Sequence, residues 1–236
     1  MQTPTQDFFS EGQVLLIDKP LEWTSHDVVA KIRNTIKIKK VGHAGTLDPL
    51  ATGLLILCTG KFTKRINEYM AQEKEYTGTI TLGAETPTYD LESAPENFKS
   101  TSSLTKEKIE EATTNFTGEI DQVPPKHSAV KQKGKPVYLM ARKGQDVILE
   151  PRKICIKHFD ITSFVNSESG CVVSFRVVCS TGTYIRSLAH DLGQYLGCGG
   201  YLSSLRRTKI GEYAVVDAMT MDAALKWIRG MSKTDN

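Results

Sequence analysis

The sequence predicts an α+β fold in which helices flank a mixed, largely antiparallel β-sheet. Three observations support this prediction. The chain has 236 residues, 39% of them hydrophobic and 24% charged, which is typical of a globular protein with a sizeable core. Segments with the apolar spacing of helices are interspersed with segments that alternate or are wholly apolar, as strands do. Neither an internal repeat nor a linker divides the sequence, so we expect a single domain over residues 1–236.

The N-terminal third is expected to form strands and helices on either side of a glycine-rich loop. Thr24 or Ser25 is suited to cap the first helix, because apolar residues follow at helical spacing. The run Leu54–Cys58 is wholly apolar and predicts a buried strand. In chain order, the expected elements are a polar, loose tail over 1–11, a strand over 13–17, the capped helix to Ile36, the buried strand over 54–58 and a helix through Ile66 and Met70.

The remainder of the chain is expected to alternate between strands, helices and one polar loop. Residues 74–82 alternate between a core-facing set and threonines, which predicts a half-buried strand. Residues 84–103 are rich in Thr, Ser, Pro and Glu and predict a loop, in which Thr86-x-x-x-Asp90 fits either a turn or a site. The further expected elements are a helix capped by Thr105, a hairpin of 153–165 with 171–179, a helix from Ser180–Thr183 to Gly197, a strand over 201–205 and a helix over 221–229.

Residues 42–53, the aspartate loop, have the clearest chemical potential. They combine glycines, a histidine and one carboxylate, Asp48, directly before the predicted buried strand. Glycines at this density mark backbone that turns sharply or approaches a ligand, and Pro49 disfavours helical backbone at Asp48. A carboxylate held stiffly in this way suits a catalytic group. The same pattern fits an ordinary tight turn, and both interpretations stay open at this point.

The formal net charge is only +3, but the basic residues are clustered. Between Asp121 and Asp146 the sequence has no acidic residue and several basic ones, among them Lys131 and Arg142. Two further clusters lie elsewhere in the chain: Lys31, Arg33, Lys37, Lys39 and Lys40, and Arg206, Arg207 and Lys209. Clusters in a nearly neutral chain favour a protein that binds a polyanion on one face. Each cluster taken alone also fits a solvated surface.

The sequence gives little support for a metal-binding, membrane-spanning, secreted or phosphate-loop protein. The cysteines form no Cys-x-x-Cys pair and the histidines show no ligand spacing, so we expect reduced thiols and no metal. No apolar run approaches the length of a membrane span, and the N-terminus lacks the profile of a signal peptide, so we expect a cytoplasmic protein. Gly60-Lys61 is followed by Phe62, which does not match a phosphate-binding loop. No cofactor is expected.

Two further side chains stand out by their place in the predicted elements. Tyr76 falls on the core-facing side of the strand 74–82, where a tyrosine usually serves packing. Arg186 falls in the first turn of a helix, where a cation opposes the helix dipole and suggests an anionic partner, although surface arginines are common. The residues alone lead as far as an RNA-binding enzyme, with a carboxylate mechanism as one option.

Several short motifs resemble those of the TruB family of pseudouridine synthases, in the family's order. They are Asp18-Lys19-Pro20, the aspartate loop, Lys74-Glu75-Tyr76, Val123-Pro-Pro-x-x-Ser-Ala-x-Lys131, Gly182-Thr-Tyr-Ile-Arg186, Leu192-Gly193 and Leu205-Arg-Arg207. The aspartate loop is highly specific. The resemblance implies the pseudouridine synthase fold and the isomerisation of uridine 55 in the T-loop of transfer RNA, without a cofactor or metal.

The resemblance also implies roles for single residues. Asp48 is the implied catalytic carboxylate, either as nucleophile at C1′ or as the base that removes the C2′ proton. Arg186 pairs with Asp48 and favours its ionised form, and Tyr76 stacks on a uracil flipped out of the RNA. The implied substrate-binding residues are His43, which fills the space left in the RNA, Tyr184 and Leu205, which line the uridine pocket, Lys19, which supports the aspartate loop from behind, and the basic residues Lys131, Arg142 and Arg206.

Two longer features follow from the same resemblance. The basic segment 123–151 is the implied mobile RNA-binding loop, which closes over the T-loop mainly through phosphate contacts, so binding should weaken steeply with salt. Only residues 214–236 follow Tyr213, so we expect a short form without the C-terminal domain of the PUA type that many bacterial members carry. A monomer is expected, because the basic faces should stay open to RNA.

Two other functions stay open. One is pseudouridine formation in another structured RNA with a hairpin like the T-loop. The other is an RNA-binding or RNA-folding protein that has lost catalysis. The presence of Asp48, Tyr76 and Arg186 together argues against the second, because a binder has no use for a carboxylate beside phosphate.

Overall fold

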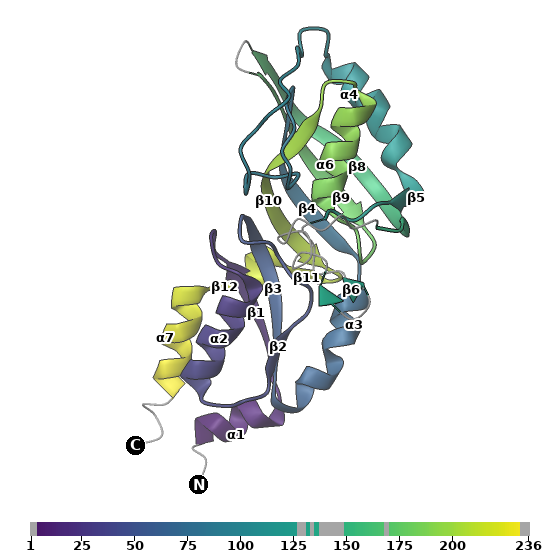
Figure 1. The fold of residues 1–236 in the computed structure, drawn as a ribbon. Coiled ribbons are helices and arrows are strands. Elements are labelled where there is room, and N and C mark those ends of the chain that lie inside the picture. The colour runs from purple at the N-terminus through teal and green to yellow at the C-terminus, as the bar shows by residue number, and fades with distance from the viewer. Residues whose placement is uncertain (1–3, 127–130, 133–134, 137–148, 168–169, 232–236) are drawn as a thin grey trace. The chain divides into compact units, whose positions relative to one another are not determined.

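The computed structural model describes residues 4–126, 131–132, 135–136, 149–167 and 170–231 (Figure 1). The chain forms two compact units, residues 1–76 with 205–236 (unit 1) and residues 77–204 (unit 2). Strands β4 (Lys74–Leu82) and β10 (Gly200–Ile210) contribute residues to both units. The expected single domain over 1–236 stays a prediction.

Unit 1 is built on a mixed sheet. Besides parts of β4 and β10, its elements are α1 (Pro4–Glu11), β1 (Val14–Lys19), α2 (Ser25–Ile36), β2 (Val41–His43), β3 (Ala51–Thr59), a 3-10 helix (Gly60–Arg65), α3 (Ile66–Ala71), β11 (Tyr213–Ala214), a 3-10 helix (Val215–Asp217), β12 (Met219–Thr220) and α7 (Met221–Met231). The strand order is β12-β1-β3-β10, with β2 beside β3 and β11 beside β10. Strand β1 runs antiparallel to β3 and parallel to β12, whereas β3 and β10 are parallel.

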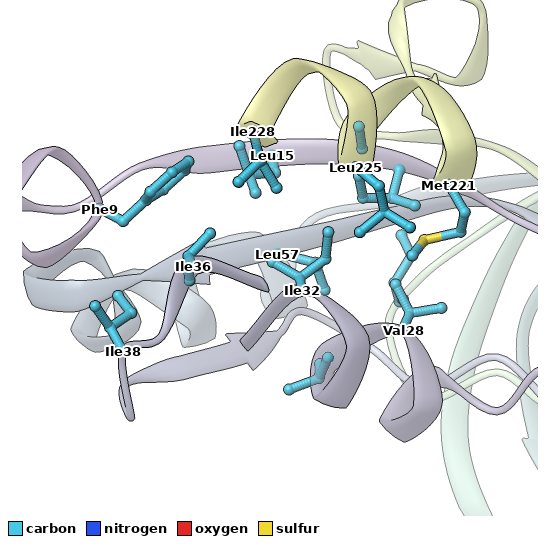
Figure 2. Close-up of a cluster of buried hydrophobic side chains, with 14 residues drawn as sticks. Phe9, Leu15, Val28, Ile32, Ile36, Ile38, Leu57, Met221, Leu225 and Ile228 are labelled. Carbon is cyan, nitrogen blue, oxygen red and sulfur yellow. The ribbon is translucent and has the colours of Figure 1, made fainter. Parts of the chain in front are cut away.

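Strand β3 is buried on both faces, which explains its unbroken apolar run. Leu55 and Leu57 belong to a cluster with buried residues of α1, α2 and α7. Figure 2 shows side chains of these three helices gathered around those of β1 and β3. The alternate residues of β3 pack in a second cluster with Tyr69 of α3. Successive side chains of a strand point to opposite faces, so a strand covered on both sides must be apolar throughout.

Unit 2 contains further strands of the sheet and two α-helices. Besides parts of β4 and β10, its elements are α4 (Lys106–Thr113), a 3-10 helix (Thr114–Phe116), β5 (Gly118–Gln122), β6 (Lys131–Gln132), β7 (Lys135–Pro136), β8 (Arg152–Ser167), β9 (Gly170–Cys179) and α6 (Ile185–Tyr195). The strand order is β10-β4-β9-β8-β5, and β6 pairs with β7. Strand β8 runs antiparallel to both β9 and β5. Helices α4 and α6 lie beside β8 and β9 (Figure 1), and their apolar faces are buried.

Most predicted elements are confirmed, including the capping of α2 by Thr24 and of α4 by Thr105. The prediction of a loose N-terminal tail is wrong, because residues 4–11 form α1. Phe9 is fully buried, with its ring 5.9 Å from that of Trp227 on α7, and the Thr59 hydroxyl donates to its carbonyl oxygen at 2.8 Å. One buried aromatic residue therefore anchors an otherwise polar segment. No helix in the described part of the chain is both long and apolar enough to cross a membrane.

Candidate active site

The aspartate loop connects β2 to β3, and these strands pair antiparallel, so both ends of the loop are fixed. Gly45 and Gly53 have φ angles of 97° and 102°, in the left-handed region that other residues rarely adopt. A Cβ at Gly53 would also lie 2.3 Å from the carbonyl oxygen of Arg207. The glycines therefore permit both a sharp turn and a close approach of two backbone segments.

Asp48 is half-buried, and the residues on both sides of it are held by hydrogen bonds. The hydroxyl of Ser25, at the start of α2, accepts from the Leu47 N–H at 2.8 Å and donates to the Leu47 carbonyl at 3.2 Å. The Glu22 N–H donates to the Pro49 carbonyl at 2.9 Å. The backbone that carries the Asp48 carboxylate is therefore fixed from outside the loop, as a positioned catalytic group requires.

Lys19 lies behind the aspartate loop with its side chain fully buried. Its ammonium donates to the carbonyl oxygens of Pro20, Trp23 and Pro49, at 2.9, 2.5 and 3.3 Å. Burial lowers the pKa of Lys19 to about 8, although the nearby Asp48 carboxylate opposes this shift. This placement agrees with the expected supporting role, which stays a prediction.

Arg207 is a second buried cation that holds the same loop, with 1% of its surface exposed. Its Nε donates to the Leu54 carbonyl at 2.8 Å and its Nη2 to the Gly45 carbonyl at 3.0 Å. Because Gly45 precedes Asp48 and Leu54 follows the loop, one guanidinium ties its two ends together. The guanidinium is a planar fork of five N–H donors, so one buried arginine can satisfy two carbonyl groups from different parts of the loop.

Leu205 and Arg206 also lie beside the exit of the aspartate loop. Strand β10 pairs Leu205 with Ala51 and Arg206 with Thr52. Leu205 is half-buried, and the Arg206 side chain is 40% exposed. Arg206 forms a two-pronged ion pair with Asp18, with N–O distances of 2.7 and 3.0 Å. Lys19, the aspartate loop, Leu205 and Arg206 are therefore brought together within unit 1.

His43 and Tyr76 belong to the same unit. His43 is half-buried at the end of β2, and its Nδ1 has no hydrogen-bond partner among the described residues. Burial lowers the pKa of His43, and the charge of Arg207 lowers it further, so the ring is neutral at pH 7. Tyr76 lies in β4 with 8% of its surface exposed, which confirms its core-facing position.

In unit 2, Arg186 is the second residue of α6, and its side chain is 5% exposed. Its Nε lies 3.6 Å from Oδ2 of Asp90, itself 6% exposed, and its Nη1 donates to the Thr88 carbonyl at 3.2 Å. The expected anionic partner at this helix start therefore includes Asp90, a carboxylate of the polar loop. A charge buried this deeply needs such partners, since an unpaired ion in a protein interior is strongly disfavoured.

Tyr184 is the N-cap residue of α6 and is half-buried. The side-chain amide of Gln122 replaces a capping hydroxyl there: its oxygen accepts from the Tyr184 N–H at 2.8 Å, and its nitrogen donates to the Tyr184 carbonyl at 3.0 Å. The Ser187 hydroxyl donates to the Val123 carbonyl at 2.8 Å. The start of the basic segment 123–151 is thereby attached to the first turn of α6.

The other predicted basic residues are placed less fully. Lys131 begins β6, opposite Pro136, whereas Arg142 lies outside the described residues. The predicted loop 123–151 is described only in part. Among the residues that the structure describes, no three His, Cys, Asp or Glu side chains are grouped so that they could hold a metal ion.

Sequence reasoning missed three residues that shape the site. Arg207 belongs to a basic cluster with Arg206 and Lys209, for which the sequence favours polyanion binding or a solvated surface, because nothing in a local pattern distinguishes a buried arginine from an exposed one. Ser25 was considered only as a helix cap. For Asp90, the sequence offers only its spacing from Thr86, which fits either a turn or a site and does not indicate a partner. All three act on residues far away in the sequence, so only the fold reveals their partners.

The chain matches the family model described as "TruB family pseudouridylate synthase (N terminal domain)" over residues 33–185. Residues 186–233 match the model described as "tRNA pseudouridylate synthase B C-terminal domain". Among curated relatives, the tRNA pseudouridine synthase B of Flavobacterium johnsoniae is 50% identical over 222 residues, covering 91% of this chain and 95% of the relative. The protein of the same name from Chlorobaculum tepidum is 49% identical over 220 residues, covering 91% and 90%.

Solved structures agree on the fold. A chain of the archaeal box H/ACA sRNP Nop10-Cbf5 complex matches 99% of this chain with a TM-score of 0.71 and 26% identity. A chain of a Cbf5-Nop10-Gar1 complex matches 99% with a TM-score of 0.72 and 28% identity. This chain covers only 58% and 59% of those chains. The predicted pseudouridine synthase fold is therefore confirmed.

Proposed function

The chain belongs to the TruB family of pseudouridylate synthases, and on that basis we propose that it isomerises uridine 55 in the T-loop of transfer RNA to pseudouridine. The observation that carries this proposal is the match to curated synthases along nearly the whole chain. The site agrees with it, because Asp48 is held in a fixed loop between strands. The reaction is an isomerisation and needs no co-reactant: the bond from C1′ to N1 breaks, the base turns, and C1′ joins C5 while the C5 proton leaves and N1 gains one.

Asp48 is the proposed catalytic carboxylate. By one route it attacks C1′ and forms a covalent intermediate, and by the other it removes the C2′ proton. Both routes need an ionised carboxylate with a fixed direction. The hydrogen bonds from Ser25 and Glu22 to the residues beside Asp48 support such a direction. The buried charge of Lys19 stabilises a negative charge on Asp48 in turn.

Arg186 is proposed to pair with Asp48 and to keep it ionised. The burial and charge of Arg186 support this proposal, because a guanidinium that is only 5% exposed is a fixed source of positive potential. Asp90 and Thr88 hold its direction from one side. Tyr76 is proposed to stack on the target uracil and to assist proton transfer at C5. The target base must then leave its stack in the RNA, which costs a few kcal/mol.

The remaining substrate contacts are proposed from the family motifs. His43, neutral at pH 7, fills the space that the flipped base leaves, and Tyr184 and Leu205 line the uridine pocket. Lys131, Arg142 and Arg206 contact phosphates, as does the loop 123–151. We also propose that the protein acts as a monomer in the cytoplasm.

The test is chemical mapping of pseudouridine in transfer RNA after incubation with the purified protein. Pseudouridine at position 55 of the T-loop is the expected outcome. Pseudouridine only in another structured RNA would replace the proposed substrate. Binding of transfer RNA without any pseudouridine would indicate an RNA-binding protein without catalysis.

A further inference from the structure

Residues Thr86–Asp90 form a tight turn that also presents a carboxylate. The Tyr89 N–H donates to the Thr86 carbonyl at 3.1 Å, which closes the turn. Oδ1 of Asp90 accepts from the Glu92 N–H at 3.0 Å, and Oδ2 lies 3.6 Å from Nε of Arg186. The sequence left open whether this motif was a turn or a site, and the structure shows that it is a turn that carries a partner of Arg186.

Tyr89 lies between Thr88 and Asp90, the two residues that contact Arg186. Both its backbone conformation and the packing of its ring are unusual. Its φ is 64°, in the left-handed region that side chains with a Cβ rarely adopt. Its ring stacks on the imidazole of His190, with centroids 3.9 Å apart and planes 12° apart. Its carbonyl accepts from the Leu202 N–H at 2.9 Å. A strained residue persists only where its surroundings hold it, so a stacked ring is a reason for this conformation.

His190 lies on α6, one helical turn after Arg186. The stack therefore joins the turn to the same helix that carries the arginine. Within the turn, the Asp90 carboxylate lies 3.6 Å from Nε of Arg186, and the Thr88 carbonyl accepts a hydrogen bond from Nη1 at 3.2 Å. A slip of the turn along the helix would move both acceptors relative to the guanidinium.

We propose that Tyr89 and His190 form an aromatic clasp that positions Arg186 for catalysis, by fixing the Thr86–Asp90 turn against α6. This inference rests on the proposed function, in which Arg186 acts on the catalytic carboxylate. Tyr89 and His190 are positioning residues, because they act through Arg186 and not on the RNA.

Both rings of the clasp are uncharged near neutral pH. Burial lowers the pKa of His190, and burial together with the charges of Asp191 and Glu85 raises the pKa of Tyr89. Nδ1 of His190 is buried and has no hydrogen-bond partner among the described residues. Two neutral rings at this distance attract one another by dispersion and quadrupole terms, so stacking holds the imidazole.

Four substitutions separate the effect of removing a ring from the effect of straining the backbone at Tyr89. Tyr89→Phe and His190→Phe keep two stacked rings, whereas His190→Ala removes one. Tyr89→Asn removes the other ring but still suits a left-handed backbone, because asparagine adopts that region more readily than most residues. Tyr195→Ala is the matched control, since Tyr195 is also on α6 and makes an aromatic contact, with Phe116 at 5.9 Å.

Steady-state kinetics on a transfer-RNA transcript, with pseudouridine as product, is the first measurement. We expect Tyr89→Asn and His190→Ala to lower kcat about tenfold, because a small displacement of a positioned group costs at least this much. KM should stay within about twofold, since ground-state RNA binding is untouched. The two phenylalanine variants and the control should keep kcat within about twofold of the original chain. Equal kcat in all variants, or loss of kcat in the phenylalanine variants, would overturn the clasp.

The second measurement does not depend on activity. The Nε–H signal of Arg186 in the nitrogen–proton NMR spectrum is assigned by its loss in Arg186→Lys. It should shift in Tyr89→Asn and His190→Ala and stay in place in Tyr89→Phe. If the original chain makes no pseudouridine, the proposed function fails, and this signal still decides whether the clasp fixes the arginine. An unchanged signal in folded Tyr89→Asn overturns the inference.

Discussion

The aspartate loop and the surroundings of Arg186 are held in place by different kinds of contact. Buried cations hold the loop by its backbone carbonyls: Lys19 reaches Pro49, and Arg207 reaches Gly45 and Leu54. Arg186 is itself the buried cation, and the carboxylate of Asp90 and the carbonyl of Thr88 contact it. In the first region, other residues hold the backbone that carries Asp48, the proposed catalytic residue. In the second region, the side chain of Arg186, which also has a proposed function, is itself one of the buried contacts. Substitutions should therefore separate activity from stability in the loop and combine them at Arg186.

The largest effect on activity is expected at Asp48. Asp48→Asn should abolish pseudouridine formation, because an amide is neither a nucleophile nor a base here. The free energy of unfolding should change little, since hydrogen bonds to the backbone hold the loop. Affinity for transfer RNA should stay within about tenfold, which is about 1.4 kcal/mol. Release of tritium from 5-tritiated uridine in a transcript measures the activity, and undiminished release would refute the catalytic role.

Arg186→Met should lower both activity and stability. Removing the guanidinium leaves the buried Asp90 carboxylate without this counter-charge, which costs about 3 kcal/mol of unfolding free energy. Urea unfolding measures the loss. The double variant Arg186→Met with Asp90→Asn should recover much of the stability but none of the activity. Full activity in the single variant would contradict both the clasp and the proposed role of Arg186.

Two adjacent arginines provide a comparison within unit 1. Arg207→Met should lower the unfolding free energy by about 2 kcal/mol, because two carbonyl groups of a buried segment lose their donor. Arg206→Met should cost less than about 1 kcal/mol, because its ion pair with Asp18 is partly exposed. The second variant should instead weaken binding of transfer RNA. Urea unfolding and a filter-binding assay separate the two effects, and equal stability losses would refute this division of labour.

The smallest expected effect is a pH dependence of stability from Lys19. Its pKa in the folded protein is about 8, below its ordinary value of 10.5, so the unfolded chain binds more protons between these two values. The contribution of Lys19 to the unfolding free energy should therefore rise by about 1 kcal/mol between pH 7 and pH 9. Comparison with Lys19→Met isolates the contribution of Lys19 from those of the other titratable groups. Parallel stability curves for the two proteins would contradict the shifted pKa.

The amino-acid sequence by itself determined most of the helices and strands, the aspartate loop and the family. Helical spacing in α2 and α6, alternation in β4 and the apolar run of β3 arise from local periodicity, so they could be predicted from neighbouring residues. The density of glycines in the aspartate loop predicts sharply turning backbone, and Gly45 and Gly53 have the positive φ angles that such backbone requires. Asp48 stands out because its glycine-rich loop is highly specific to the family.

Only the tertiary structure decided which charged residues are buried and what they contact. Arg206 and Arg207 are adjacent residues of the same type, but they point to opposite faces of β10. Arg206 therefore pairs with Asp18 and is partly exposed, whereas Arg207 is buried against the aspartate loop. Phe9, Asp90 and Tyr89 likewise depend on partners that are distant in sequence: Trp227, Arg186 and His190. Burial and pairing are properties of long-range contacts, and a local pattern carries no information about which segment will cover it.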